Sequence, residues 1–202
     1  MSSFTILNEV TLELRRRVFN AMQTALGVDL GFTDELVNIV LGAPQESPDT
    51  GARLSLYLYH VGINNSMRNQ NMLAQPGRDD ELRAPPLPLE LRYLATPTDD
   101  EETGQLILGR MLQFVYDNPS LNTIDNNPLG NSFGGASREL RLIPDLLNVE
   151  QLSQLWNAFS QPFRLSMAFQ VDVVAIDSQR SPIVAPRVVE VLAVSGIKER
   201  SA

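Results

Sequence analysis

The chain has 202 residues, a hydrophobic content of 43% and a formal net charge of −8 at pH 7, values that suit one domain, or at most two small ones, with a packed core. It contains no cysteine, which excludes a disulfide framework, a thiolate nucleophile and a thiolate metal site. The acidic charge argues against generic nucleic-acid binding, and no apolar run has the length of a signal peptide or a membrane span, so we expect a cytoplasmic protein.

The first part of the chain predicts one long helix and two strands. Phe4 to Leu26 repeats apolar residues every four positions, the spacing of an amphipathic helix. A short strand is expected over Leu36 to Leu41. Arg53 to Ile63 alternates leucine with serine and tyrosine, the period of a strand, and its aromatic side suggests that both faces are covered. The segment from Asn64 to Arg83 is polar and predicts no strand.

The stretch from Pro88 to Pro119 predicts a strand, a sharp turn and a buried helix. Pro97 should end the strand, because proline has no N–H to give to a neighbouring strand. Thr98 and Glu101 have the spacing of a capping box at the start of the helix. The acidic run from Asp99 to Glu102 suits the positive end of the helix dipole.

The next segment, Ser120 to Ser137, is rich in asparagine, glycine and serine and shows no periodicity. We expect it to be a long, mobile loop that is dispensable for folding.

The last third of the chain predicts two strands, a helix between them and a final strand. Leu140 and Leu142 mark the first strand. Asn148 and Gln151 have capping-box spacing for a helix that places Trp156 in the core. The second strand runs from Phe163 to Ile176, and its alternation points one set of side chains inward: Leu165, Met167, Phe169, Val171 and Val173. Arg187 to Val194 is expected to return as a last strand, antiparallel to the one before.

This order of elements indicates an α+β fold in a single domain over residues 1–202. We expect one mixed, mostly antiparallel sheet with about three helices packed largely on one face. The final strand is apolar on both faces, so either it is central in the sheet or something outside the chain covers it. Strand rules favour the central position.

None of the sequence patterns that could indicate catalysis, metal binding or cofactor binding is complete. Gly130 to Gly134 matches the G-x-S-x-G motif around Ser132, but that motif works only between a strand and a helix and needs a later histidine. The single histidine, His60, lies upstream and fits a hydrogen-bonded residue near a strand end. We therefore expect no enzyme, no metal and no cofactor.

The ordered blocks of the chain resemble one family. The blocks are LSLYLYHVGINNSMRNQ, then PPLPLELRYLATP, then the acidic-capped helix, then EQLSQLWNAFSQPFRLSMAFQVDVVAID. In this order they resemble the N-terminal domain of the tail-terminator, or cap, protein of phage-like contractile injection systems.

The resemblance implies a structural function. A cap of this kind forms a homo-hexameric ring on the last layer of the inner tube and sheath, stops polymerisation and holds the sheath end, without catalysis. Its partners are the sheath and inner-tube proteins, and it is assembled in the cytoplasm without spanning a membrane. As interface residues we select one face of the final strand: Arg187, Val189, Val191 and Ala193.

Two other functions stay open from the sequence. The chain is alternatively a small-molecule-binding or enzymatic α+β domain, which a convergent pocket with a strongly perturbed ionisable group would favour. It is otherwise another component of the same particle, from the baseplate or the tube.

Overall fold

The computed structural model forms two compact units, each of which is built from two separate stretches of the chain. One unit comprises Met1–Asn69 and Pro86–Asp177, and the other comprises Gln70–Pro85 and Ser178–Ala202. Whether the two units act as the expected single domain stays a prediction. The residues that the structure describes are 4–25, 27–44, 51–64, 71–75, 78–129 and 139–184.

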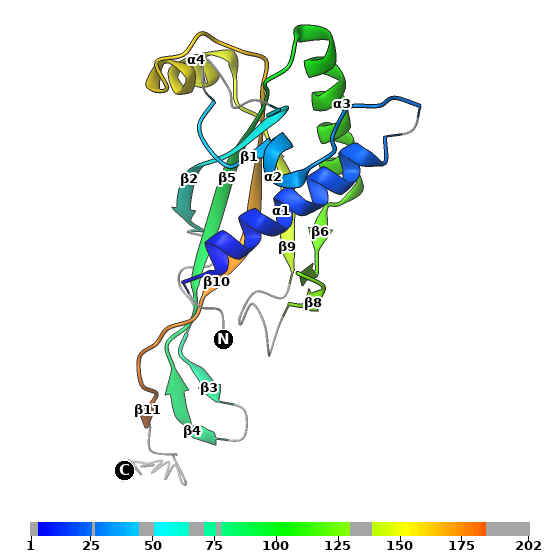
Figure 1. Ribbon diagram of the computed structural model, residues 1–202. Coiled ribbons are helices and arrows are strands. Elements are labelled where there is room, and N and C mark those ends of the chain that lie inside the picture. The colour runs from blue at the N-terminus through cyan, green and yellow to red at the C-terminus, as the bar shows by residue number, and fades with distance from the viewer. Residues whose placement is uncertain are drawn as a thin grey trace, which may run out of the picture. The chain divides into compact units, whose positions relative to one another are not determined.

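The larger unit is built on a six-stranded sheet with the order β1-β2-β5-β10-β9-β6 (Figure 1). The short edge strand β1 pairs with β2 in parallel, and every other neighbouring pair is antiparallel. This is the mixed, mostly antiparallel sheet that the sequence predicts. In sheet order, the strands are β1 (Ile39–Val40), β2 (Leu54–Ile63), β5 (Leu87–Pro97), β10 (Met167–Ile176), β9 (Leu140–Asp145) and β6 (Ser120–Leu121).

Two long helices cover one face of this sheet and a third lies over the other. The helices of the unit are α1 (Ile6–Gln23), the short α2 (Glu35–Asn38), α3 (Glu101–Asp117) and α4 (Val149–Ala158). Helices α1 and α3 share a core with the sheet, as expected. Helix α4 packs on the opposite face, where the ring of Phe159 at its C-terminal end meets Tyr57 of β2 at 5.6 Å between centroids. The aromatic side of β2 is thus covered, as its pattern suggested.

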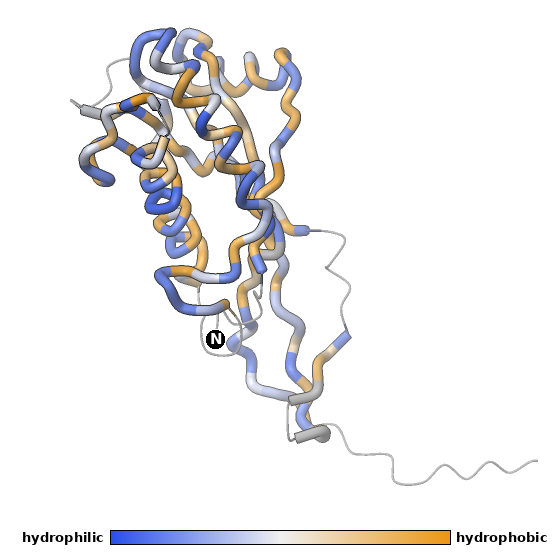
Figure 2. Tube along the Cα trace, turned by 90° about the vertical axis from the view of Figure 1, so that its right-hand side faces the viewer, coloured by the Kyte–Doolittle hydropathy of each residue, from blue (hydrophilic) through white to orange (hydrophobic). Residues whose placement is uncertain are grey.

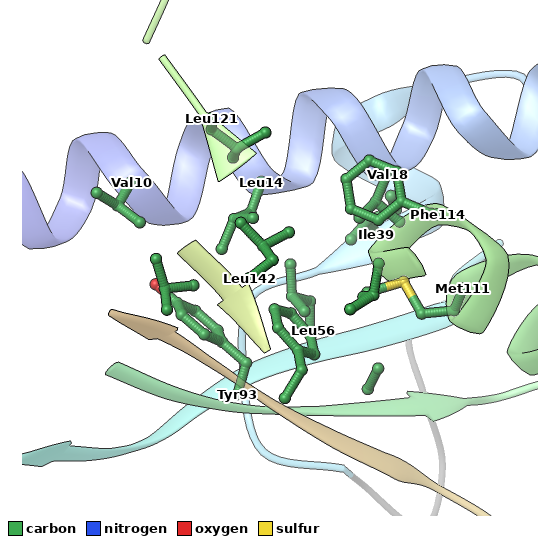
Figure 3. Close-up of a cluster of buried hydrophobic side chains, with 14 of the residues drawn as sticks. Val10, Leu14, Val18, Ile39, Leu56, Tyr93, Met111, Phe114, Leu121 and Leu142 are labelled. Atoms are coloured by element: carbon green, nitrogen blue, oxygen red, sulfur yellow. The ribbon is translucent and has the colours of Figure 1, made fainter. Parts of the chain in front are cut away.

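The main core lies between α1, α3 and the sheet, and Figure 3 shows side chains from these elements converging on it. Val10, Leu14 and Val18 form the buried stripe of α1, at the four-residue spacing seen in the sequence. Helix α3 contributes Met111 and Phe114 from its own buried stripe. Because both stripes are continuous and apolar, removing them from water is the main favourable contribution to folding of this unit.

Strand β5 is the centre of the sheet. It pairs with β2 along one edge and with β10 along the other for almost its whole length. Tyr93 points into the core, stacks on Phe169 of β10 at 5.4 Å and shares a hydrogen bond of 2.8 Å with Thr11 of α1. Leu94, the next residue, points to the opposite face and is also buried. Both faces of β5 are therefore covered, although its outer face also carries Glu90 and Arg92, which pair with each other at 2.6 Å.

The turn between β5 and α3 differs from its prediction in one detail. Strand β5 ends at Pro97, as expected, but the N-cap of α3 is Asp100, whose carboxylate accepts from the Thr103 amide at 3.0 Å. The predicted cap, Thr98, instead donates its hydroxyl to the carbonyl of Ala52 at 2.6 Å. An aspartate takes the capping position because its carboxylate also gains from the helix dipole.

The start of α4 agrees with its prediction. Asn148 accepts from the Gln151 amide at 2.8 Å, and the Gln151 side chain accepts from the Asn148 amide, so the capping box is complete. Trp156 is 2% exposed and contacts the rings of Phe159 and Phe163. A second, smaller apolar cluster therefore anchors α4 to the sheet unit.

Two predicted strands have different boundaries. Of the strand expected over Leu36 to Leu41, only β1 forms, because Asp34 caps the short helix α2 and its carboxylate accepts from the amides of Leu36 and Val37. In β10 the register shifts between Val171 and Val174, and Val174 lies in the core. The predicted inward side chain of Val173 is outside the described set. Leu165 precedes β10 and is exposed, not inward as predicted.

The loop predicted over Ser120 to Ser137 is wrong in its first ten residues. These residues form β6 and then a hairpin of β7 (Thr123–Ile124) and β8 (Asn127–Pro128). Leu121 and Ile124 are buried in the main core, and Asp125 and Asn126 adopt positive φ in the turn. A local pattern did not reveal this, because two separated apolar residues anchor the segment and the turn depends on asparagine and aspartate chemistry. The rest of the predicted loop, from Gly130 on, lies outside the described residues.

The smaller unit contains a three-stranded antiparallel sheet with the order β11-β4-β3. Its strands are β3 (Leu73–Gln75), β4 (Arg78–Arg83) and β11 (Ile183–Val184). Two of them fall in the polar stretch from Asn64 to Arg83, where the sequence predicted none. The predicted final strand, Arg187 to Val194, lies outside the described residues.

Hydrophobic and hydrophilic residues alternate along the described chain, without a long block of either kind (Figure 2). In keeping with this pattern, none of the helices in the described ranges is both long enough and apolar enough to cross a membrane.

We expect Trp156→Ala to lower the free energy of unfolding by about 3–5 kcal/mol, as for other truncations of large core side chains. Tyr116→Ala is the matched control, because Tyr116 is an aromatic residue on the outer side of α3 that is 84% exposed, and it should change stability by about 0.5 kcal/mol or less. Chemical denaturation measures both. Equal losses for the two variants would contradict the placement of α4.

Candidate functional site

The outer face of the sheet, beneath α4, carries a linked set of polar side chains. Tyr59 donates its hydroxyl to Asp145 Oδ2 at 3.1 Å, and Arg92 Nη1 lies 3.3 Å from the same oxygen. Arg92 Nε also donates to Glu90 Oε1 at 2.6 Å. The set joins β2, β5 and β9 across the sheet.

The electrostatics of this set suit structure and not proton transfer. Burial, followed by the negative charge of Asp145, raises the pKa of Tyr59 to about 12, so the phenol stays neutral. The hydrogen bond to Glu90 raises the pKa of Arg92 further above an already high value. A general base or nucleophile must exchange a proton near neutral pH, and neither group does so.

The predicted candidate His60 lies beside these residues, in a shallow groove of about 510 Å³. It is exposed on β2, where a register shift pairs it with Arg92. Among the residues that line this groove no serine, threonine or carboxylate accompanies His60, so the geometry of a nucleophile with its base is missing there. The lining residues are Tyr59, His60, Arg92, Leu147, Gln151, Gln154, Leu155 and Ala158.

A second groove, of about 390 Å³, lies at the N-terminal end of α3. Two of its acidic side chains have roles in the fold: Asp100 caps the helix, and Asp99 pairs with Arg53 at 3.0 Å. Phe163 and Leu165 form an exposed apolar side of the same groove. The acidic run noted in the sequence therefore has a structural explanation.

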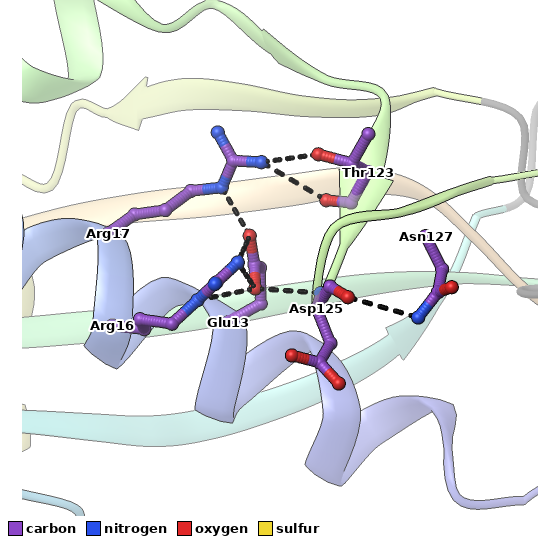
Figure 4. A network of polar contacts seen from close by, with 6 residues as sticks. All are labelled: Glu13, Arg16, Arg17, Thr123, Asp125 and Asn127. Carbon is purple, nitrogen blue, oxygen red and sulfur yellow. Dashed lines mark hydrogen bonds and ion pairs between the residues drawn. The ribbon is translucent and has the colours of Figure 1, made fainter.

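A buried carboxylate links α1 to the β7–β8 hairpin (Figure 4). Glu13 is 3% exposed, and it accepts hydrogen bonds from Arg16, Arg17 and the amide of Asp125, the last at 3.0 Å. Arg17 also donates to the hydroxyl of Thr123 at 2.7 Å. Two consecutive arginines of α1, Arg16 and Arg17, thus pair with one buried carboxylate.

These contacts stabilise the ionised form of Glu13. Burial alone would raise the pKa of Glu13, but the hydrogen bond from the Asp125 amide and those from Arg17 and Arg16 outweigh it and hold the pKa below its ordinary value. The carboxylate is enclosed and fully partnered, so we assign it to the fold and not to a reaction.

The remaining candidate residues lie outside the described ranges. Ser132 and its motif from Gly130 to Gly134 belong to them, and so does the selected interface face of Arg187, Val189, Val191 and Ala193. Across the ranges that the structure does describe, no group of three or more histidine, cysteine, aspartate or glutamate residues is arranged to hold a metal ion.

The open edge of β2 is the feature of the sheet that sequence reasoning missed. Strand β1 pairs only with Leu54 and Ser55, so the rest of β2 has no strand neighbour on that side among the described residues. Val61 and Ile63 are 44% and 48% exposed along this part. An uncharged strand edge with exposed apolar residues offers unpaired backbone groups to which another strand can bind. The signal in the sequence was the absence of any charged residue from Leu56 to Ile63.

Comparison with known families gives a match over most of the chain. The sequence model of the Pvc16 N-terminal domain matches residues 9–190. The chain belongs to this family. A search of the curated proteins found no match.

Two solved structures are similar in fold to this Pvc16 N-terminal domain. One is the sheath/tube terminator of an extracellular contractile injection system, PVC, in the extended state, which is 14% identical with a TM-score of 0.55 over 95% of this chain and 64% of the other. The second is the tube-terminating cap of the anti-feeding prophage, AFP, which is 15% identical with a TM-score of 0.59 over 92% of this chain and 60% of the other. This chain thus spans less than two thirds of either protein's length.

We expect Glu13→Gln to lower the free energy of unfolding of this Pvc16 N-terminal domain by about 1.5–3 kcal/mol at neutral pH, because it removes the charge from a buried carboxylate that accepts several hydrogen bonds. The lowered pKa gives this contribution a pH dependence. It is complete above the ordinary pKa near 4.5 and is lost as the pH falls through the lower pKa of the folded state.

The control is Glu9→Gln, since Glu9 is only partly buried on the same helix and accepts a hydrogen bond only from exposed Thr5 in the described contacts. Urea denaturation between pH 7 and pH 3 measures both variants. A loss for Glu13→Gln that stays constant over this range would contradict the charged, partnered state of Glu13.

Proposed function

We propose that this chain is a tail terminator, or cap, of a contractile injection system. The observation that carries the proposal is the likeness of fold to a sheath/tube terminator and to a tube-terminating cap over more than nine tenths of the chain. The family match over residues 9–190 supports the same assignment. The cap ends the polymerisation of the inner tube and sheath and holds the sheath end during contraction.

A cap of this kind acts as a homo-hexameric ring. Identical subunits joined by two different surfaces form either a closed ring or an open filament, and a ring presents six equal copies of one face. Six equal faces match the six-fold end of a tube and of a sheath. The partners are accordingly the sheath protein and the inner-tube protein, and the particle is assembled in the cytoplasm.

No reaction is part of this function. The groups that the sequence and the structure bring forward as chemical candidates are neutral, like Tyr59, or enclosed, like Glu13, or lack a reacting neighbour, like His60. The predicted interface face of the final strand, Arg187, Val189, Val191 and Ala193, remains our proposal for contact with a neighbouring chain. Its support is its apolar alternation in the sequence.

The enzymatic alternative has no observation in its favour. It called for a convergent pocket around a strongly perturbed ionisable group. Tyr59 and Arg92 line one groove, and their raised pKa values make both poorer acids near pH 7. Asp100 lines the other groove, and the hydrogen bonds from Thr103 at the helix cap hold its pKa below the ordinary value. A baseplate or tube component remains a hypothesis of the same structural class, which the following experiment separates.

Deletion of the gene in cells that produce the particle should give tails of aberrant length or sheaths detached from the tube end. The reason is that nothing then stops subunit addition. Electron microscopy of purified particles measures the length distribution. Normal-length, contractile particles would rule out the cap function, and particles without baseplates would favour the baseplate alternative.

Complementation supplies the matched control. The wild-type gene and His60→Ala should both restore normal length, because His60 is exposed and has no catalytic neighbour in its groove. If a folded His60→Ala protein failed to restore normal tail length, that result would support the enzymatic alternative.

A further inference from the structure

The two long edges of the large sheet are unequal. At one edge, β1 covers only the first two residues of β2, so the eight residues from Leu56 to Ile63 keep unpaired backbone groups on that side within the described chain (Figure 1). At the other edge, β6 pairs with Leu140 and Arg141 of β9. Each edge therefore has an uncovered part whose sequence decides whether another strand can join.

The uncovered part of β9 carries the usual protection against strand addition. It contains Pro144, which has no N–H, and the charged residue Asp145. The uncovered part of β2 contains neither proline nor a charged residue. It is rich in leucine and tyrosine, residues that suit a strand. The edge of β2 can therefore accept another strand, whereas the edge of β9 is protected against strand addition.

A β-bulge near the end of β2 places Val61 and Ile63 on the core face of the sheet, where they form an exposed apolar surface that we call the platform. The register shifts between Leu58 and His60, after which Val61 lies opposite Leu91 and Ile63 lies opposite Leu89. Directly opposed residues share a face, and Leu91 and Leu89 are buried in the main core. Val61 and Ile63 therefore extend the core face to the sheet edge, yet they are 44% and 48% exposed. A strand added at this edge would cover them if it carried apolar residues at every second position.

We propose that the open edge of β2 accepts the segment Arg187–Val194 from a second copy of this chain. Val189, Val191 and Ala193 alternate along this segment, which gives it the apolar face that the platform requires. Its eight residues match the eight open residues of β2. Only Arg187 and Glu190 are charged, so the segment brings no row of like charges to an uncharged edge.

Donor and acceptor are different parts of the chain, so the contact is heterologous. Each subunit gives one strand and receives one, and such a contact closes into a ring when the rotation between subunits permits. The inference rests on the proposed cap function, since it names the contact that holds the ring together. It also predicts that self-association persists in the isolated protein, without tube or sheath.

Cysteine cross-linking tests this contact directly, because the chain has no cysteine of its own. Val61→Cys supplies the acceptor position, and Val189→Cys, Val191→Cys and Ala193→Cys supply three donor positions in separate proteins. Mixing acceptor and donor proteins under mild oxidation should give a disulfide-linked dimer of one of each for at least one donor. Opposed residues on paired strands have the separation that a disulfide needs.

Two controls make the result specific. Leu112→Cys, on the exposed side of α3, replaces Val61→Cys as acceptor and should give at least tenfold less mixed dimer. A protein with both Val61→Cys and Val191→Cys should form linked oligomers. If it instead links only within single chains, the segment pairs in its own subunit and the proposal is overturned.

Charge at the edge tests the same contact without cysteine. Val61→Lys with Ile63→Lys should weaken self-association at least tenfold, as measured by analytical ultracentrifugation, and should keep the circular dichroism spectrum and Tm of a folded protein. Leu106→Lys with Leu112→Lys, at similarly exposed positions on α3, should leave self-association unchanged. Val191→Pro removes an N–H from the donor and should repeat the edge result.

The failure of this inference and that of the cap function are distinguishable. Rings that survive the lysine pair, or the absence of a mixed dimer at all three donor positions, overturn strand exchange while a length defect after gene deletion still supports the cap. A specific mixed dimer together with normal-length particles after deletion supports strand exchange and rejects the cap.

Discussion

Strand β5 imposes the main constraint on the larger unit, because it is paired along both edges and covered on both faces. Its core face must be apolar, whereas on its outer face the charged residues Glu90 and Arg92 pair with each other. Its neighbours β2 and β10 must each supply a second covered face. Helices α1 and α3 cover one face and α4 covers the other. The two apolar clusters, one around Tyr93 and one around Trp156, are consequences of this central placement.

The position of α1 on this sheet depends on polar contacts as well as on its apolar stripe. Apolar packing lets a helix slide with little loss, whereas hydrogen bonds have fixed partners. Thr11 bonds to Tyr93 of the central strand, and Arg15 pairs with Glu35 of α2. Glu13 fixes the helix to the hairpin that follows α3. Contacts with three other elements thus set the position of one helix. An apolar residue in place of the buried Glu13 would not fix the position of the helix in the same way, because it has no hydrogen-bond partner.

The sequence predicted those parts of the fold that depend on local patterns. The four-residue spacing of α1, the alternation of β2 and the capping box at Asn148 each act within a few residues, so each is visible without tertiary contacts. The hairpin at Thr123 was missed because its two anchors, Leu121 and Ile124, gain their burial from α1 and from the rest of the core. The bulge in β10 was missed for the same reason, since register is a property of a pair of strands.

The open edge of β2 is also a feature that local sequence patterns do not reveal. The sequence indicated that β2 is covered on both faces, and the Tyr57 side confirms it, but a strand also has two edges, and edge pairing depends on the order of strands in the sheet. The positions of charged residues and prolines show which edge is protected only when the order of strands in the sheet is known. Pro144 and Asp145 then become edge protection, and the uncharged run of β2 becomes a receptive edge.

A subunit that ends a polymer benefits from this inequality. Two receptive edges on one sheet would let strand pairing continue in both directions, and an open series of contacts would follow. One receptive edge and one protected edge limit each subunit to a single strand acceptor. If the donor comes from the neighbouring copy, every β2 edge in a closed ring is filled, and the uncovered part of β9 stays protected by Pro144 and Asp145. Strand pairing would then end with the ring, because no receptive β2 edge is left for a further copy.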